Sequence, residues 1–272
     1  MNAESAKRRA GRKVAARDFT ATPRGKARPR SAGPADRQLI ADLVAANRVL
    51  AREGVLDGWG HVSVRHDQDS SRYLLSRSLA PEFVRPGDIL EFDLDNNAVD
   101  DRGHGLYTER FLHGEIYKVR PDVVAICHCH APPVIPFGVI DVPLKPMYHR
   151  AAFIALGVPI FEIRDAAGMT DLLIRNPALG AALAKSISDK PAVLMRGHGA
   201  TVVAPSLPRL VGRSIFLALN ATLQAQAMIM TGGGAINYLD PEEARLIEAR
   251  EGYGLGRAWE AWKRKALKSG GR

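Results

Sequence analysis

The stretch "TERFLHGEIYKVRPDVVAICHCHAPP", residues 108–133, contains the features that decide the fold. Its first half has apolar residues at helical spacing: Leu112, Ile116 and Val119. Pro121 then blocks further helix, so residues 108–120 are predicted to form one helix. The β-branched run that follows predicts a short buried strand before Pro132. A helix leading directly into a buried strand is typical of a mixed α/β domain.

The predicted strand carries two histidines and two cysteines in alternation. Successive side chains on a strand point to opposite faces, so His128 and His130 share one face and Cys127 and Cys129 share the other. A catalytic zinc site needs at least three protein ligands, and His198 between two glycines in "MRGHGATV" is the candidate third ligand. Two histidines on one face can also be satisfied by ordinary hydrogen bonds, so the spacing leaves both interpretations open.

The predicted helix also has a polar stripe, in which Glu109, His113 and Tyr117 follow one another every four residues. A carboxylate in the first turn of a helix is commonly a surface group stabilised by the helix dipole. If Glu109 instead faces a metal, it is a candidate general acid/base. His113 would then either orient another residue of the site or pack the helix.

The charge of the chain is concentrated at its start. Residues 1–30 contain ten basic and two acidic residues and so carry +8 of the net charge of +9 in a chain of 272 residues. We therefore expect residues 1–35 to form a disordered basic extension and expect no nucleic-acid partner for the domain. A transit peptide or a weak nucleic-acid-binding arm are the alternatives for this segment.

No apolar run approaches the length of a membrane span, and the first residues lack the apolar stretch of a secretory signal. Cys127 and Cys129 are the only cysteines and stand two positions apart, a poor geometry for a mutual disulfide. These observations predict a protein without a membrane partner, located in a reducing cytoplasm.

The remaining patterns predict one continuous domain over residues 36–265 with a short disordered tail at 266–272. We expect hairpin strands at "HVSVR" (61–65) and "RYLLS" (72–76), a pair around the turn in "DILEFDLDNNAVD", and strands flanking the glycine turn in "AVLMRGHGATVVA". Helices are expected at 39–50, 147–156, 177–188, the long segment with Val211, Ile215, Leu219 and Leu223, and after Asp240. "VPIFEI" should be a strand.

Together, "TERFLHGEIYKVRPDVVAICHCH" and "RGHG" resemble the class II aldolase/adducin family. The resemblance spans roughly residues 36–250 and implies a single-domain α/β/α sandwich with a central, mostly antiparallel sheet. It implies a divalent metal ion per chain, zinc or alternatively manganese, bound by His128, His130 and His198, with Glu109 as catalytic acid/base. It also implies a homo-oligomer, commonly a tetramer, with sites near subunit boundaries.

Departures from the aldolase pattern point to the substrate. His61 stands where aldolases of the family commonly have asparagine, and their small phosphate-binding residues are replaced by Ser76 with Arg77 and by Tyr107 with Thr108. Arg77 and His61 in this place suit a planar carboxylate, to which an arginine can donate two parallel hydrogen bonds. Arg77 could equally be an ordinary surface cation. The candidate substrate-binding residues are His61, Ser76, Arg77, Tyr148 and His149.

The variant motifs resemble the family branch that decarboxylates carboxylated ring-cleavage products and dihydroxybenzoate-type acids in aromatic catabolism. The resemblance therefore implies a metal-dependent lyase acting on a small carboxylated substrate through a metal-stabilised enolate. The alternatives are an aldolase that cleaves an unphosphorylated hydroxy-oxo acid or sugar derivative, and a non-catalytic adducin-like interaction module.

Overall fold

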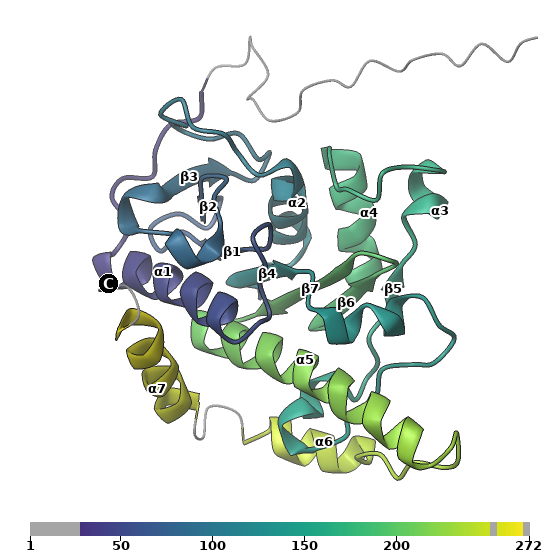
Figure 1. The fold of residues 1–272 in the computed structure, drawn as a ribbon. Coiled ribbons are helices and arrows are strands. Elements are labelled where there is room, and N and C mark those ends of the chain that lie inside the picture. The colour runs from purple at the N-terminus through teal and green to yellow at the C-terminus, as the bar shows by residue number, and fades with distance from the viewer. Residues whose placement is uncertain (1–27, 251–254, 269–272) are drawn as a thin grey trace, which may run out of the picture.

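Seven strands form one sheet in the part of the chain that the computed structural model describes, residues 28–250 and 255–268 (Figure 1). Neighbouring strands are antiparallel except for the last pair, β6 and β5. The strand order is β3-β2-β1-β4-β7-β6-β5. The strands are β1 (His61–Arg65), β2 (Arg72–Ser76), β3 (Ile89–Asp93), β4 (Ala125–Cys129), β5 (Ile160–Phe161), β6 (Ala192–Met195) and β7 (Gly199–Ala204).

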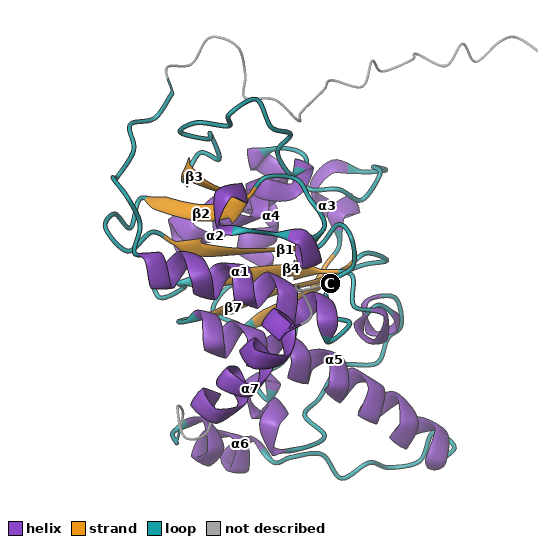
Figure 2. Ribbon diagram, turned by 60° about the vertical axis from the view of Figure 1, so that its left-hand side comes forward, coloured by secondary structure: helices purple, strands orange, loops and turns teal. Residues whose placement is uncertain are grey.

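Helices cover both faces of this sheet, so the α/β/α sandwich is confirmed (Figures 1 and 2). On one face, Cys127 packs in an apolar cluster with Leu210 of α5; on the other, Ile126 packs in a second cluster with Leu183 of α4. The helices are α1 (Arg37–Arg52), α2 (Phe111–Val119), α3 (Ile163–Ala167), α4 (Pro177–Ile187), α5 (Leu207–Met230), α6 (Pro241–Glu248) and α7 (Leu255–Lys268).

Several helix ends follow from local sequence. The Asp36 carboxylate accepts hydrogen bonds from the first backbone N–H groups of α1, and Gly54 follows that helix with a φ of +71°. Asp240 and Glu243 form a reciprocal capping box at the start of α6, with Pro241 in the first turn. The capped start of α6 confirms the helix predicted after Asp240.

The predicted helix over 108–120 begins as a 3₁₀ turn, η3 (Thr108–Arg110), and continues as α2. Every residue from Phe111 to Tyr117 is buried, because α2 lies between the sheet and α4. The apolar and polar stripes are therefore both inside. Val119, predicted to face the core, is 60% exposed, since it stands at the last position of the helix.

Two predicted elements after the histidine strand are shorter than expected. The helix predicted over 147–156 is a 3₁₀ helix, η6 (His149–Ile154), and the strand predicted in "VPIFEI" is reduced to β5. Gly157, with a φ of +93°, ends the helix, and Pro159 lacks the N–H group that a longer strand would use. The second strand of the pair predicted in "DILEFDLDNNAVD", which would follow β3, makes only one bridge, from Phe92 to Ala98.

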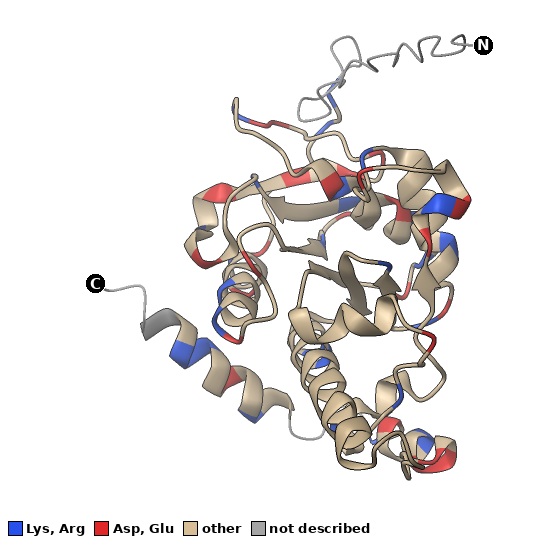
Figure 3. Cartoon of the chain, turned by 45° about the vertical axis from the view of Figure 1, so that its right-hand side comes forward, with Lys and Arg blue, Asp and Glu red and all other residues tan. Residues whose placement is uncertain are grey.

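Both ends of the domain extend beyond the predicted boundaries. The side chain of Ser31 and the backbone N–H of Ala32 donate to Glu91, so these residues, expected in the extension, contact the domain. Ala266, expected in the tail, is buried in α7. Residues 1–27 and 269–272 lie outside the described part. Figure 3 shows basic and acidic residues interspersed along the ribbon. Among the described helices, none is long and apolar enough to cross a membrane.

Candidate metal centre

Four side chains converge beside the end of β4. Glu109 lies in η3 and His128 lies in β4. His130 is the first residue after β4, and His198 lies in the turn between β6 and β7. One donor atom from each lies within 4.8 Å of all the others. Nε2 of His130 is 3.1 Å from Nε2 of His128 and 3.0 Å from Nε2 of His198. Glu109 Oε2 is 3.2 Å from Nε2 of His128 and 3.4 Å from Nε2 of His198.

The pairing of β4 with β7 explains why His198 reaches the other two histidines. Cys129 is directly opposite Ala200 in the antiparallel register, so the turn that precedes β7 lies beside His130. Gly199 makes this approach possible, because a Cβ there would overlap the carbonyl oxygen of Cys129. Gly197 adopts a φ of +63°, which favours glycine. The sequence pattern contained these glycines but not the strand pairing that makes them necessary.

Groups outside the motifs fix the orientation of the donors. Nδ1 of His130 is 3.0 Å from the Asp57 carboxylate, and Nδ1 of His198 donates to the carbonyl oxygen of Leu172 at 3.0 Å. Glu109 Oε1 accepts a hydrogen bond of 2.9 Å from the backbone N–H of Ile174. The sequence motifs predict none of these three partners. Two act through the backbone, and Asp57 stands in a loop with no recognisable spacing.

The electrostatics of the cluster keep Glu109 ionised. Burial raises the pKa of Glu109, but the charge and hydrogen bonds of His128 and His198 outweigh burial and hold that pKa well below its usual value. Burial lowers the pKa of His198, but its hydrogen bond and charge interaction with Glu109 give a net increase. For His128, burial dominates and the pKa is lowered. An anionic oxygen therefore lies among three imidazole nitrogens.

This donor set fits a divalent cation. Two ligands of a tetrahedral zinc with bonds of about 2.0–2.1 Å lie roughly 3.3 Å apart, close to the separations above. The Nδ1 contacts of His130 and His198 are those typical of metal-ligating histidines, because they leave Nε2 with a free lone pair. The Nδ1 atom of His128 is buried and has no hydrogen-bond partner within the described residues.

Of the five predicted substrate-binding residues, His61 lies nearest the cluster. It is opposite His128 in the β1–β4 register, and the two ring centroids are 5.2 Å apart. Burial, followed by the charges of His113 and His128, lowers the pKa of His61 well below its usual value, so this ring is neutral. The Tyr107 ring packs against His61 at a tilt of 44°, with the ring centroids 4.4 Å apart.

Ser76 contacts this region through Tyr107, whereas the side chain of Arg77 bonds to Asp88. The hydroxyl of Ser76 is 3.3 Å from the hydroxyl of Tyr107. Arg77 donates from Nε to Asp88 at 2.7 Å, and its side chain is 31% exposed. Within the described residues the two terminal nitrogens of its guanidinium make no hydrogen bond, so only Nε of this planar group has a partner.

Tyr148 and His149 belong to a different region. The Tyr148 ring contacts His149 and Phe216 of α5, and its hydroxyl is buried with no hydrogen-bond partner among the described residues. His149 lines a cavity of about 260 Å³ together with Arg209 and Phe216. Within one chain, the structure does not bring these two residues to the histidine cluster.

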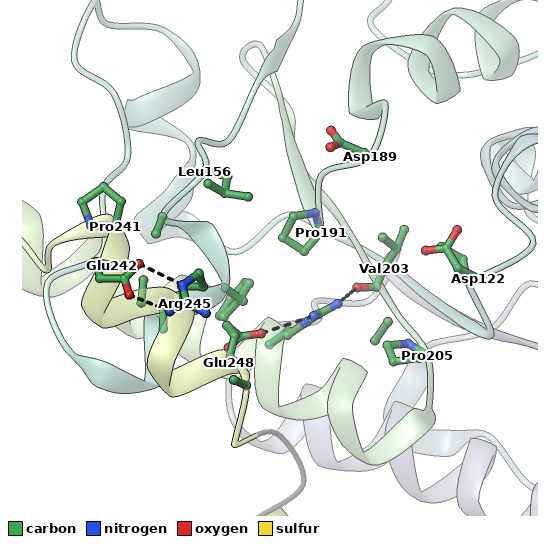
Figure 4. Close-up of a pocket in the computed structure, with 18 of the residues that line it drawn as sticks. Asp122, Leu156, Asp189, Pro191, Val203, Pro205, Pro241, Glu242, Arg245 and Glu248 are labelled. Carbon is green, nitrogen blue, oxygen red and sulfur yellow. Dashed lines mark hydrogen bonds and ion pairs between the residues drawn. The ribbon is translucent and has the colours of Figure 1, made fainter.

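A larger cavity, of about 1020 Å³, lies at the other end of β7, where Val203 and Pro205 line it (Figure 4). The cavity contains none of the four converging residues. Its arginines have partners: Arg213 donates to the Val203 carbonyl at 2.8 Å and Arg245 pairs with Glu242. The candidate metal centre is therefore the cluster of Glu109, His128, His130 and His198 and not this cavity.

Comparison with known proteins agrees with this geometry. The sequence model of the family described as class II aldolase and adducin N-terminal domain matches residues 41–225 of this chain. The decarboxylase tropJ of Talaromyces stipitatus is 34% identical over 85% of this chain and 95% of its own length. A 3,4-dihydroxyphthalate decarboxylase of Arthrobacter keyseri is 31% identical over 80% of this chain and 89% of its own length.

Solved structures show the same fold. An aldolase II superfamily protein from Pseudomonas syringae superposes with a TM-score of 0.73 at 22% identity, covering 87% of this chain and 95% of its own. L-fuculose 1-phosphate aldolase from Glaciozyma antarctica superposes with a TM-score of 0.69 at 19% identity, covering 88% and 95%. The sequence relatives indicate a lyase. The chain therefore belongs to the class II aldolase and adducin family.

Proposed function

We propose that this lyase decarboxylates a carboxylated dihydroxyaromatic or hydroxy-oxo acid with the help of one divalent cation per chain, zinc in preference to manganese. The observation that carries the proposal is the convergence of Glu109, His128, His130 and His198 within 4.8 Å. Two relatives that this chain matches over most of their length are named decarboxylases, one of them for 3,4-dihydroxyphthalate. We infer a related substrate and a role in aromatic catabolism.

In this proposal the three histidines hold the cation and Glu109 moves the proton. When bound, a divalent cation supplies Lewis acidity that stabilises negative charge developing on a substrate oxygen. The bond to the carboxylate breaks, its electron pair stays on the substrate, and carbon dioxide leaves. Glu109, ionised at rest, takes a proton from a substrate hydroxyl or from water and delivers it to the carbon that lost carbon dioxide.

Arg77 is the proposed carboxylate-binding residue. Asp88 fixes its Nε, which leaves the end of the guanidinium free to donate to a substrate carboxylate. Ser76, beside Arg77, and His61 are proposed to line the same substrate site. The runner-up, an aldolase for an unphosphorylated hydroxy-oxo acid, uses the same donor set. The residues at His61 and Arg77 favour decarboxylation over sugar-phosphate cleavage.

The proposal extends to assembly and location. Ile229 and Met230, at the end of α5, are 80% and 86% exposed, and apolar side chains so exposed support a homo-oligomer, which we propose to be a tetramer. In a tetramer with sites near subunit boundaries, Tyr148 and His149 could serve a neighbouring subunit. Both cysteines are free and buried, which supports a reducing, cytoplasmic location.

Metal analysis and product analysis test the proposal together. We expect about one zinc ion per chain in the purified protein, loss of the ion in His128→Ala, and carbon dioxide from 3,4-dihydroxyphthalate. Glu109→Gln should keep the ion but lower turnover by roughly 10²-fold, because a proton-transfer group is lost. Aldehyde from a sugar phosphate, with no carbon dioxide from any carboxylated acid, would favour the aldolase. Full activity of metal-free protein would exclude the metal-dependent mechanism of both the decarboxylase and the aldolase.

A further inference from the structure

Four buried side chains form a continuous hydrogen-bond chain that runs from the core to the metal centre. Tyr117 of α2 is 2.9 Å from the hydroxyl of Ser63 on β1, and that hydroxyl is 2.7 Å from Nδ1 of His113. Nε2 of His113 is in turn 2.7 Å from Nδ1 of His61. We call Tyr117, Ser63, His113 and His61 the polar chain. Two of its members, His113 and Tyr117, belong to the polar stripe of the predicted helix.

The inner end of the polar chain sets its direction. The Tyr117 hydroxyl lies 3.2 Å from the carbonyl oxygen of Val124, which can only accept, so the tyrosine donates there. Ser63 must then donate to Tyr117, and Nδ1 of His113 must donate to Ser63. A neutral imidazole has one donor and one acceptor nitrogen, so Nε2 of His113 accepts from Nδ1 of His61.

The opposite direction is possible but makes one hydrogen bond fewer. If Tyr117 donated to Ser63, every later link would reverse, and the contact with the Val124 carbonyl would no longer be a hydrogen bond. All four side chains are buried, and in a buried network an unmade hydrogen bond is unfavourable. The geometry therefore favours the direction in which His61 carries its proton on Nδ1.

The outer nitrogen of His61 then has a lone pair to offer. Nε2 of His61 makes no hydrogen bond within the described residues. Other polar atoms that lack a partner are fully shielded from solvent, but this nitrogen is not one of them. The His61 ring lies between His113 and the cluster, with centroids 4.8 Å and 5.2 Å from His113 and His128. We propose that Nε2 of His61 accepts a hydrogen bond from a substrate hydroxyl and that the polar chain holds it in this acceptor state.

This inference deepens the proposed function and rests on it for the identity of the ligand. A lone pair repels a carboxylate or phosphate oxygen and attracts a hydroxyl. It therefore changes the role predicted for His61 from carboxylate binding to recognition of a phenolic or alcoholic hydroxyl. The carboxylate is left to Arg77. Substrates would be selected for a hydroxyl near the oxygen that the cation binds.

The tautomer can be measured without activity. In zinc-loaded protein labelled with ¹⁵N-histidine, long-range proton–nitrogen spectra show which nitrogen of each of the eight histidines is protonated, and His61→Gln assigns the His61 signal. We expect Nδ1–H at His61 in the wild type. In Tyr117→Phe, Ser63 loses its acceptor and turns to His113, so both imidazoles should switch to Nε2–H. Nε2–H at His61 in the wild type would overturn the inference.

Tyr73→Phe is the matched control. Tyr73 is a buried tyrosine of the same layer, stacked 6.2 Å from His113, but its hydroxyl donates to Asn96 and is outside the polar chain. This variant also loses one buried hydroxyl, and we expect it to leave both tautomers unchanged. A switch in Tyr73→Phe would mean that general loosening, and not the polar chain, controls the tautomer.

A binding cycle tests the role toward substrate. The dissociation constants of 3,4-dihydroxybenzoate, 3-hydroxybenzoate and 4-hydroxybenzoate are measured for the wild type and Tyr117→Phe. An acid that lacks one hydroxyl loses any contact of that hydroxyl with the metal in both proteins. This loss therefore cancels when the preference of the wild type is divided by the preference of the variant. We expect the preference for one hydroxyl to fall by roughly 3- to 10-fold in the variant, the worth of one hydrogen bond. Unchanged preference would overturn the acceptor role. If the wild type binds none of the acids, the proposed function fails, while the spectra still decide the tautomer.

Discussion

His130 illustrates how much of the metal centre depends on residues outside the motif. Its Nε2 lies at about 3 Å from two other imidazole nitrogens, and its Nδ1 contacts Asp57, whose side chain is 41% exposed. A carboxylate behind a ligating histidine fixes its tautomer and increases its basicity. The charge on Asp57 should therefore strengthen metal binding without contacting the metal.

Asp57→Asn tests whether the charge on Asp57 strengthens metal binding. Asparagine keeps an acceptor near His130 but removes the charge, so we expect zinc affinity to fall by roughly 10- to 100-fold. Competition with a chelator of known affinity measures this directly. Asp69→Asn serves as control, because the Asp69 carboxylate accepts its hydrogen bonds from Ser71 in the β1–β2 turn, and we expect this variant to bind zinc as the wild type does. Equal affinity in the two variants would show that Asp57 has no such role.

At the scale of elements, periodicity predicted which segments are helices better than it predicted which sides are buried. In α5 the expected four-residue row included Leu219, which is 43% exposed, whereas Leu210, Val211, Leu217 and Ala221 are buried. Four residues exceed one helical turn of 3.6, so a row spaced by four drifts around a long helix and leaves the core.

The metal centre shows a similar division. The motifs predict His128, His130 and His198 as metal ligands and Glu109 as acid/base, and the structure brings these four side chains together. Their partners could not be predicted, because the Leu172 carbonyl and the Ile174 N–H belong to a loop whose backbone conformation the sequence does not encode locally. Leu172 even adopts a φ of +68°, unusual for a residue with a side chain.

Gly199→Ala tests the contact between β7 and β4. The new methyl group would overlap the Cys129 carbonyl, and both strands are central, so the structure must shift. We expect a loss of roughly 1–3 kcal/mol of unfolding free energy, measured by denaturant titration, together with weaker zinc binding. Gly87→Ala, where a Cβ would meet no atom within 4 Å, is the control. A wild-type midpoint for Gly199→Ala would contradict the argument.

At the scale of the molecule, the boundary of the basic extension can be located by deletion. The composition of residues 1–27 predicts no contribution to a buried core, so removing them should leave the melting temperature unchanged. Removing residues 1–35 also deletes the hydrogen bonds of Ser31 and Ala32 to Glu91 and should lower it. Equal melting temperatures for the two deletions would show that these hydrogen bonds add no stability.

The last prediction concerns how the metal couples to the whole fold. The three histidines proposed to hold the cation come from β4, the residue after β4 and the β6–β7 turn, so they are brought together only in the folded chain, and a cation that binds them must stabilise that state. At free zinc of 100 times the dissociation constant the gain is about 2.7 kcal/mol, or roughly 5–10 °C in melting temperature for a domain of this size. Dialysis against EDTA should lower the melting temperature by that amount, and added zinc should restore it.

His128→Ala provides the control for this coupling. The variant loses a fully buried ligand and should melt lower than the wild type at the outset. Its melting temperature should then respond to neither EDTA nor zinc, because the site no longer has three imidazoles. A wild type indifferent to chelation would show that the four side chains hold no metal. A zinc response that persists in His128→Ala would place the ion elsewhere in the chain.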